Sequence, residues 1–412
     1  MRNKSLLALV ITLLASLCAV ADDRPRARDL GIPLEGTPGS LNAITDVPGI
    51  TVGHTTIIEG DGKLVVGEGP VRTGVTAIFP RGAEGVQTPV FAGTYALNGN
   101  GEMTGTIWVE EGGQLAGPIT ITNTHSVGVV RDSVIEWLVS QDKDLEWSLP
   151  VTAETWDGSG YSYQGLNDAN GFHVKKKHVF NALDTASSGP VTEGSVGGGT
   201  GMVCNEFKGG IGTSSRVIEI DGESYAVGVL VQCNYGLRSW LKVAGVPVGM
   251  EMEQPKICVE NAEYWREGSV DLPCDRKADG RVDDTGSIIV VVATDAPLLP
   301  HQLKRVARRV GPALGRLGSF AGNGSGDIFI AFSTANAKAF GYDAVMDLKM
   351  VPNSSINPVF EGAVLATEEA VVNSMLAADT MIGADTVRVP GLPHAELQRV
   401  LREYNRLNEL AD

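Results

Sequence analysis

The stretch Asp283–Val292 constrains the fold of this 412-residue chain more than any other. Polar, turn-prone residues run directly into the apolar, β-branched segment Ile288–Val292. This pattern predicts a loop that enters a buried strand at a single point, and the residue at that point is Ser287, preceded by Gly286. The chain is 43% hydrophobic, which supplies enough apolar material for a large core.

The Gly286–Ser287 bond is a candidate cleavage site as well as part of a turn. If it were cut, Ser287 would become a chain terminus with both a hydroxyl nucleophile and an α-amine that can act as its base, as in N-terminal-nucleophile hydrolases. A glycine–serine pair before a strand is also an ordinary turn. The catalytic interpretation therefore depends on partners elsewhere in the chain.

The first 21 residues are typical of an export signal. Two basic residues precede the apolar segment Leu6–Leu17, and the small residues Ala19-Val20-Ala21 follow it as a cleavage site. Because the apolar segment is too short to span a bilayer comfortably, we expect a cleaved signal peptide at 1–21, no membrane anchor and a periplasmic or secreted mature chain, 22–412. The formal net charge of −16 argues against binding to nucleic acid or to an anionic membrane surface.

The cysteines and histidines give no support to metal chemistry. Cys258 and Cys274 flank a polar segment, so in an oxidising compartment we expect a disulfide that closes this loop. Cys204 and Cys233 lie among apolar residues and are expected to be buried thiols. The histidines are scattered without an H-E-x-x-H motif, and there is no C-x-x-C motif, so we predict neither a metal site nor a cofactor.

Short β-branched segments separated by glycines predict strands over much of the chain, whereas helical periodicity appears mostly late. Strands are predicted at 50–52, 63–66, 74–79, 106–109, 119–122, 209–216, 224–233, 287–294 and 327–333. Helices are predicted at 127–140, 300–317, 357–377 and 394–409, with a kink at Gly311-Pro312. Residues 250–285 are polar and are expected to form an exposed excursion. This order, with no obvious linker, predicts a single α+β domain with helices outside packed sheets.

Two glycine-rich segments need interpretation. Gly194–Gly201 lacks the lysine of a phosphate-binding loop and the spacing of a dinucleotide-binding fingerprint, so we expect a tight turn where two backbones approach. Gly322–Asp327 contains Ser325, whose hydroxyl can hydrogen-bond a neighbouring hydroxyl while Asp327 orients it. A helix between Ser287 and Ser325 would allow both strands to start on the same edge of one sheet.

Two further polar residues lie at strand ends. Glu154 belongs to a loop after a short strand, where it can be a solvated acid or an anchor for a substrate ammonium group. Asn234 ends the apolar strand 226–233, and an amide at a strand end is well placed to donate a hydrogen bond to an oxyanion.

Six motifs spread over nearly all of the mature chain connect these residues. They are TDVPG at 45–49, LND at 166–168, SVGGGTGM at 195–202, GVLVQCNYG at 228–236, DAPLLPHQL at 295–303 and GNGSGD at 322–327. In these motifs the chain resembles the DmpA/BapA family, which comprises L-aminopeptidase/D-amino-acid esterase-amidases and β-aminopeptidases. The last three motifs are quite specific.

The resemblance implies a four-layer αββα sandwich of the N-terminal-nucleophile type. It implies one inactive precursor that cleaves itself between Gly286 and Ser287 into an α chain, 22–286, and a β chain, 287–412, and that assembles as a homo-oligomer of αβ units. The implied activity is removal of N-terminal residues from short peptides, amides or esters, including β- or D-amino acid derivatives, through an acyl-enzyme on Ser287.

The resemblance also implies roles for the other candidate residues. Ser325 and Asp327 would position and polarise the nucleophile, and Asn234 would stabilise the oxyanion. Glu154 would anchor the free amine of the substrate, with Trp156 beside it in the binding site. From the resemblance we expect a tyrosine at the position of Trp156 in several relatives, and an indole N–H can donate a hydrogen bond but cannot relay a proton.

Compared with the family that it resembles, the chain has two insertions, and two alternative functions remain open. The insertions at Ser159–Gln164 and about Cys258–Cys274 lengthen two loops, one of them near the proposed pocket, where it could alter specificity. One alternative is an acyltransferase of the ornithine-acetyltransferase type, against which the serine nucleophile and the export signal both argue, because that family uses a threonine. The other is an exported, non-catalytic binding protein in which Gly286–Ser287 is only a turn.

Overall fold

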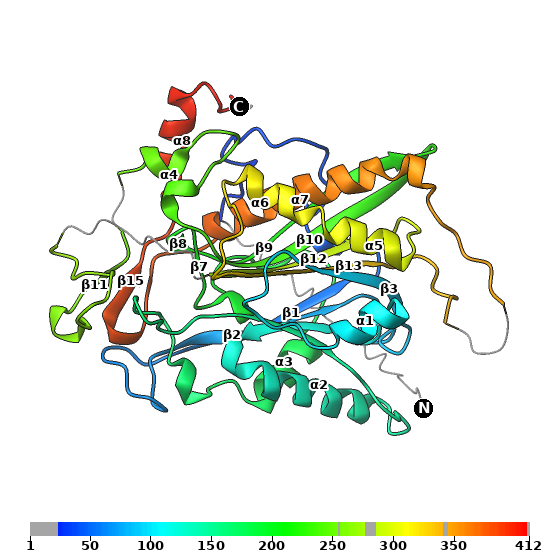
Figure 1. Ribbon diagram of the computed structural model, residues 1–412, viewed down its shortest axis with the longest axis horizontal. Helices are drawn as coiled ribbons and strands as arrows, with labels where there is room; N and C mark the ends of the chain where they lie inside the picture. Colours follow the sequence, from blue (N-terminus) through cyan, green and yellow to red (C-terminus); the bar gives the residue numbers. More distant parts are fainter. Residues whose placement is uncertain (1–23, 254–255, 277–285, 341–344, 410–412) are drawn as a thin grey trace, which may run out of the picture.

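The computed structural model describes residues 24–253, 256–276, 286–340 and 345–409. Two β-sheets pack face to face, and each carries helices on its outer side, so that the chain forms four layers (Figure 1). The expected α+β, αββα sandwich is therefore confirmed. The predicted signal peptide, 1–21, and the polar residues 283–285 lie outside the described residues.

A six-stranded sheet forms one of the two central layers. Its strand order is β4 (Gln114–Leu115), β3 (Val90–Ala96), β13 (Gly326–Ser333), β12 (Ser287–Thr294), β10 (Glu223–Asn234) and β9 (Gly210–Ile220). Its outer face is covered by α5 (Pro300–Ala307), α6 (Val310–Arg316) and α7 (Asn357–Leu376) (Figure 1).

A four-stranded sheet forms the other central layer. Its strand order is β1 (Thr51–Glu59), β2 (Val71–Phe79), β5 (Ile119–Asn123) and β6 (Val151–Thr155). Its outer face is covered by α2 (Val127–Gln141) and α3 (Lys176–Asp184) (Figure 1). Helix α1 (Thr106–Gly112) lies near β3.

Several short elements complete the fold. They are β7 (Val203–Cys204), β8 (Phe207–Lys208), α4 (Val248–Glu251), β11 (Cys258–Val259), β14 (Met381–Ile382), β15 (Val387–Val389) and α8 (His394–Glu403). Of these, β11, β15, α4 and α8 lie at one end of the fold (Figure 1). The segment 250–285 was predicted to be an exposed excursion, and this holds only in part for its described residues: Arg266 and Glu267 are exposed, but other residues are buried. Val259 is fully buried because β11 pairs with β15 in a small sheet.

The central strand β12 explains why the chain contains an unbroken apolar run. Successive side chains of a strand point to opposite faces of the sheet. Ile288 and Val290 pack into the core under the helices, whereas Ile289 and Val291 pack into the core between the two sheets. Both faces are covered, so every residue of β12 is buried and an alternating polar pattern is excluded.

The strand ends gather the candidate residues at one edge of the six-stranded sheet. Strands β12 and β13 are parallel, with Ser287 opposite Gly326, because α5 and α6 carry the chain back between them. Strand β10 runs antiparallel to β12, which places its last residue, Asn234, opposite Ser287. The prediction that two strands would start on the same edge is confirmed.

Two of the predicted strands are wrong. Residues 106–109 belong to α1, which lies between Gly105 and Gly113, both of them in the left-handed backbone region. In α1 Val109 is buried and Ile107 is exposed, whereas a strand would place both on one face. Residues 63–66 form a turn region in which Val65 makes a single bridge to Gly69.

The predicted late helices are confirmed with changes at their ends. The helix expected at 300–317 is divided into α5 and α6, and the break falls before Gly311-Pro312. Pro312 is then in the first turn of α6, where its missing N–H leaves no helical hydrogen bond unmade. Helix α8 ends at Glu403, earlier than predicted.

The structure contains two disulfide bonds. The expected Cys258–Cys274 bond is present. The prediction that Cys204 and Cys233 are free thiols is wrong, because they are bonded to each other with Cα atoms 5.5 Å apart. The hairpin of β7 and β8 folds Cys204 back onto the end of β10, a proximity that local apolar context does not reveal.

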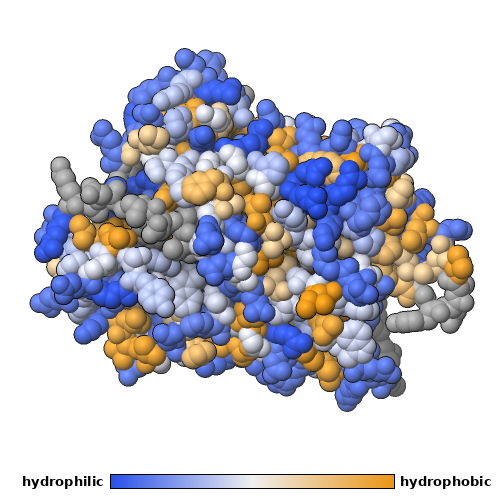
Figure 2. Space-filling model, in the orientation of Figure 1, coloured by the Kyte–Doolittle hydropathy of each residue, from blue (hydrophilic) through white to orange (hydrophobic). Residues whose placement is uncertain are grey.

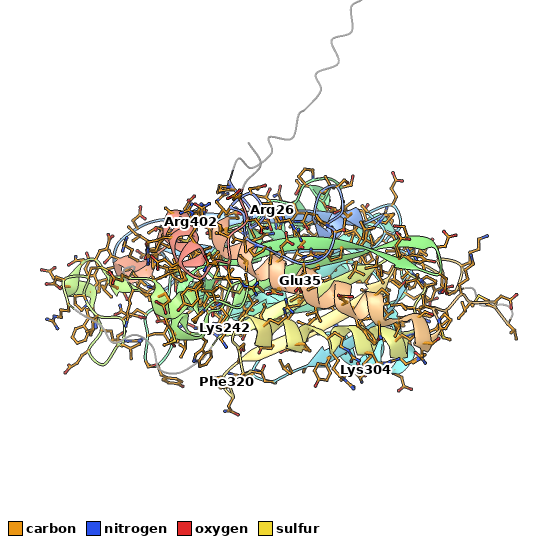
Figure 3. All side chains as sticks on the ribbon, turned by 90° about the horizontal axis from the view of Figure 1, so that it is seen from above. Arg26, Glu35, Lys242, Lys304, Phe320 and Arg402 are labelled. Carbon is orange, nitrogen blue, oxygen red and sulfur yellow. A yellow bond between two sulfur atoms is a disulfide. The ribbon has the colours of Figure 1, made fainter. Side chains whose placement is uncertain are left out.

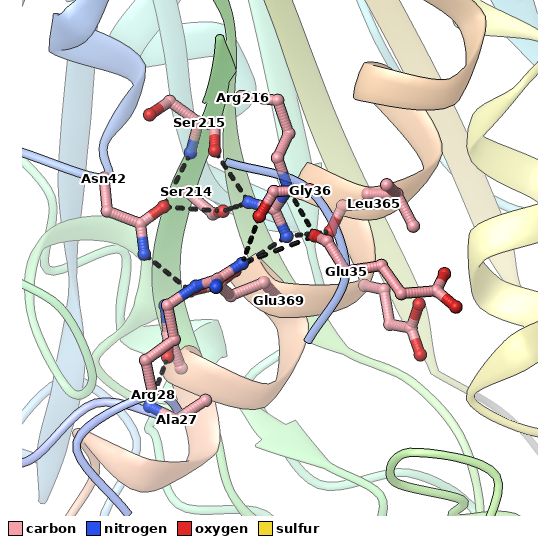
Figure 4. A network of polar contacts seen from close by, with 12 residues as sticks. Ala27, Arg28, Glu35, Gly36, Asn42, Ser214, Ser215, Arg216, Leu365 and Glu369 are labelled. Atoms are coloured by element: carbon pink, nitrogen blue, oxygen red, sulfur yellow. Dashed lines mark hydrogen bonds and ion pairs between the residues drawn. The ribbon is translucent and has the colours of Figure 1, made fainter. Parts of the chain in front are cut away.

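The N-terminal segment is tied to α7 by a buried ion network (Figure 4). Arg216 Nη2 of β9 donates to Glu369 Oε2 of α7 at 2.7 Å, and Arg28 Nε donates to the same carboxylate at 3.0 Å. Arg216 Nε also donates to the backbone oxygen of Glu35, which lies over α7 (Figure 3). Burial raises the pKa of Glu369, but the charges and hydrogen bonds of Arg216 and Arg28 outweigh it, and the net pKa lies below its ordinary value.

The surface shown in Figure 2 is mixed, with hydrophobic residues in separate patches among hydrophilic ones. Of the helices that the structure describes, none is both long enough and apolar enough to cross a membrane.

Candidate active site

Three of the predicted site residues meet at one cleft. Ser287, Glu154 and Trp156 all line a cleft of about 930 Å³, which is within the size range of small-molecule and peptide sites. Ser287 comes from the start of β12, whereas Glu154 lies in β6 and Trp156 directly follows that strand. The cleft is therefore built from both sheets of the sandwich.

The Ser287 hydroxyl lies directly beside the Gly286 carbonyl. Ser287 Oγ donates to Gly286 O at 2.8 Å. The Gly326 N–H donates to Ser287 Oγ at 3.1 Å and to Gly286 O at 3.3 Å. A fixed N–H donor at this point stabilises negative charge on either oxygen, which is the charge that develops when the hydroxyl attacks a carbonyl.

Ser325 and Asp327 hold this N–H donor in place from either side. Both are fully buried, and Ser325 Oγ donates to Asp327 Oδ1 at 2.7 Å. Asn98 donates to Asp327 Oδ2 at 3.0 Å and accepts from the Asp327 N–H. Within the segment 325–327, the group that contacts the Ser287 hydroxyl is the backbone N–H of Gly326, and Ser325 and Asp327 lie on either side of it as positioning residues.

Glu154 is a buried carboxylate at the wall of the cleft. Its side chain accepts from the Glu102 N–H at 2.8 Å and from the Thr124 hydroxyl. Among the residues that the structure describes, no lysine or arginine forms an ion pair with it. Burial raises its pKa, and the two hydrogen bonds offset only part of that effect. A desolvated carboxylate without a cation can gain strongly from an ammonium group.

Trp156 joins the cleft to a smaller pocket that contains Asn234. Its indole ring contacts His125 edge to face, with ring centroids 4.8 Å apart. Its backbone oxygen accepts from Asn234 Nδ2 at 2.9 Å, and Asn234 Oδ1 accepts from the Val203 N–H at 2.7 Å. Asn234 lines a pocket of about 40 Å³ together with Gly286, and it does not line the larger cleft. An amide nitrogen has two hydrogens, and the bond to Trp156 uses one of them. The predicted oxyanion role of Asn234 stays a prediction.

The glycine-rich segment 194–201 is the tight turn that was predicted. A Cβ atom on Gly198 would lie 2.6 Å from the Ile121 oxygen, and one on Gly199 would lie 2.5 Å from the Ile211 nitrogen. Lys208 holds the turn from within, because its Nζ donates to the Met202 oxygen at 2.7 Å. Only glycine permits such close approach of backbones.

Sequence reasoning missed several contributors to the site. Asn98 follows β3 in an Asn-Gly-Asn-Gly run, a polar segment at a strand end that could have been selected as a candidate. Thr124 and Glu102 hold Glu154, and the Gly326 N–H has no side-chain signature at all. Within the described part of the chain, no group of three or more His, Cys, Asp or Glu side chains is placed to hold a metal ion.

A serine at a strand start with a backbone N–H donor beside it, and a buried acid in the same cleft of an αββα sandwich, is the arrangement expected of a serine hydrolase of the N-terminal-nucleophile fold. Residues 42–389 match the model of Peptidase family S58, and the chain belongs to this family. It is therefore an enzyme, and a non-catalytic binding protein is the wrong alternative.

Similar proteins support the same class. The chain is 53% identical to "Beta-peptidyl aminopeptidase BapA" of Sphingosinicella microcystinivorans over 94% of its own length and 95% of the relative's. The L-aminopeptidase D-Ala-esterase/amidase from Ochrobactrum anthropi, described as a prototype for the serine aminopeptidases and a variant of the Ntn hydrolase fold, is 46% identical. It superimposes with a TM-score of 0.81, and the match covers 93% of this chain and 100% of that one. A β-aminopeptidase from Burkholderia sp. is 43% identical, with a TM-score of 0.77 and coverage of 92% and 99%.

Proposed function

We propose that the chain is an exported, self-processing aminopeptidase that removes N-terminal residues, β-amino acids in particular, from short peptides, amides or esters. The precursor would cleave between Gly286 and Ser287 into an α chain, 22–286, and a β chain, 287–412. The names of the similar proteins support the β-peptidyl and the esterase/amidase parts of this proposal.

In the processing step, Ser287 Oγ attacks the Gly286 carbonyl carbon and the Gly286–Ser287 C–N bond breaks, leaving an ester and a free α-amine. Water then hydrolyses the ester and releases the Gly286 carboxylate. The hydrogen bonds from the Gly326 N–H to both oxygens favour this attack.

In the peptidase step, the α-amine of Ser287 takes the hydroxyl proton while the hydroxyl attacks the substrate carbonyl. The proton passes to the leaving amine as the peptide bond breaks. Water then attacks the Ser287 ester, and the N-terminal residue of the substrate leaves as a free amino acid.

The observation that carries the proposal is the position of Glu154. Its carboxylate lines the same cleft as Ser287, is only 3% exposed and has no lysine or arginine in an ion pair among the described residues. A substrate ammonium group would supply the missing charge, and this would restrict cleavage to residues with a free amine.

Denaturing electrophoresis and a hydrolysis panel test the proposal. Purified wild-type protein should run as two chains, and Ser287→Ala should run as one chain without activity. The panel would contain the anilides of β-alanine, D-alanine and several L-amino acids, with release of the aniline followed by absorbance. A wild-type protein that remains a single chain yet hydrolyses these substrates would contradict the mechanism. Strict dependence on an acyl acceptor would favour an acyltransferase.

Export and assembly are further parts of the proposal. Two disulfide bonds are expected of a protein in an oxidising compartment, and they support a periplasmic or secreted location together with the signal-like residues 1–21. Intact-mass measurement of protein recovered from the periplasm or medium should give an α chain that begins near Asp22. Light scattering should give a mass that is a multiple of one αβ unit.

A further inference from the structure

Two loops outside the catalytic groups form one wall of the cleft. The first is the inserted loop 159–164, of which residues 159–163 line the cleft. The second is the disulfide loop, 258–274, which contributes Arg266 and Glu267. Only one loop was expected near the pocket, and the structure brings both of them to it.

The disulfide loop and the inserted loop are joined by several hydrogen bonds. Arg266 Nη2 donates to the backbone oxygen of Gly160 at 2.7 Å and to that of Tyr163. The Arg266 N–H donates to Gln164 Oε1 at 2.9 Å. The Val270 N–H donates to the Ser162 oxygen at 2.8 Å, and this backbone–backbone bond holds the two loops together independently of the arginine. These hydrogen bonds between the two loops hold Arg266 at the cleft.

Arg266 has hydrogen-bonding capacity that these loop contacts do not use. Its Nη2 group donates to the two backbone oxygens of the inserted loop, whereas its Nε and Nη1 groups form no hydrogen bond or ion pair with the residues that the structure describes. Of the charged side chains among the described residues that line the cleft, Glu102, Glu154 and Glu267 are acidic, and Arg266 alone is basic. The cleft therefore presents one cationic group and several anionic ones.

We propose that Arg266 is a specificity-determining residue that binds the C-terminal carboxylate of a short peptide substrate. The proposal rests on the proposed function, in which Glu154 holds the substrate amine and Ser287 attacks the first carbonyl. The remainder of the peptide must then occupy the rest of the cleft, where a carboxylate is repelled by Glu102 and Glu267 and attracted by Arg266. A guanidinium group offers a carboxylate paired N–H donors, so free short peptides are preferred over their C-terminal amides.

The test compares β-alanyl-alanine with β-alanyl-alaninamide, with release of β-alanine measured by chromatography. We expect the KM of wild-type protein to be about threefold to fivefold lower for the free acid, a modest factor because Arg266 is exposed and Glu267 offsets part of its charge. Arg266→Gln should bring the ratio of the two KM values to about one. High salt should shrink the wild-type preference in the same direction.

Arg276→Gln is the matched control, because the Arg276 guanidinium lies over the Trp265 ring, 5.7 Å from its centroid, and Arg276 does not line the cleft. The Arg276→Gln variant should keep the wild-type ratio of the KM values for the amide and the free acid. If Arg266 served only to position the inserted loop, Arg266→Gln would raise both KM values by the same factor, and that result would overturn the inference. Equal KM values for the two peptides in wild-type protein would overturn the inference about Arg266 and leave the proposed function intact. If processed wild-type protein cleaved neither peptide, the proposed function would be overturned as well.

Discussion

Glu154 and Glu369 are both buried glutamates, and their surroundings differ in one respect. Glu369 lies between Arg28 and Arg216, and their charges bring its pKa below the ordinary value despite burial. Glu154 has hydrogen-bond donors but no lysine or arginine in an ion pair within the described chain, and burial raises its pKa. The comparison indicates that Glu369, which is buried with its counter-ions, supports the fold, whereas Glu154, which is buried without one at the wall of a cleft, is a candidate to bind a charged ligand.

The largest expected effect is on stability, at Glu369. Glu369→Ala leaves two arginines without their buried partner and should lower the free energy of unfolding by about 3–5 kcal/mol. Denaturant unfolding monitored by circular dichroism would measure it. Glu368→Ala is the control on the same helix, because Glu368 pairs with the partly exposed Arg316 and its loss should cost about 1 kcal/mol. Equal losses in the two variants would contradict the assignment of Glu369 to the fold.

The next effect is on activity, at Glu154. Glu154→Gln keeps the shape of the side chain but removes the charge that would hold the substrate amine. We expect kcat/KM to fall roughly 10- to 100-fold, the range of one charge-assisted hydrogen bond, with little loss of stability. Steady-state kinetics on a β-alanine anilide would measure it. Glu102→Gln, which changes an exposed acid of the same cleft, should alter kcat/KM by less than about threefold. If Glu154→Gln lost much stability but kept its kinetics, Glu154 would have a structural role like that of Glu369.

The smallest effect is the pH dependence, which should have opposite signs at the two glutamates. The folded-state pKa of Glu369 lies below its unfolded value near 4.5, so its contribution to stability is present above that pH and is lost as the pH falls through the folded pKa. The folded-state pKa of Glu154 lies above 4.5, so its ionisation opposes folding, and this penalty grows as the pH rises through the folded pKa.

In the proposed function the substrate amine binds ionised Glu154, so on acidification KM should rise while the protein is still folded, and unfolding should follow at lower pH. Parallel profiles of KM and of melting temperature from about pH 8 to about pH 4 would measure both. A Glu154→Gln enzyme whose KM keeps the same rise on acidification would show that another group is responsible.

Much of the sandwich could be predicted from local pattern. The unbroken apolar run of β12 indicates that both of its faces are covered, and the spacing of Val130, Val134 and Leu138 indicates the buried face of α2. The glycines at 194–201 indicate a turn where backbones approach closely. Segment 106–109 was wrongly predicted to be a strand, because its β-branched residues suit a strand and only the surrounding contacts select a helix.

The candidate site was predicted less completely than the fold. Ser287, Glu154 and Trp156 meet at one cleft, whereas Asn234 lies in the pocket next to it. The missing contributors were those whose importance comes from a distant partner. Asn98 is separated from Asp327 by 229 positions, and nothing in its own neighbourhood specifies that contact.

The sequence by itself determined most of the buried strands and helices and several of the residues that could do chemistry, because side-chain periodicity and residue type are local properties. Only the tertiary structure decided which distant residues contact one another. It joined Cys204 to Cys233, placed the Gly326 N–H on the Ser287 hydroxyl and set Arg266 at the wall of the cleft. These contacts depend on strand register and on how separate loops pack, which arise only when distant parts of the chain bury their apolar faces together.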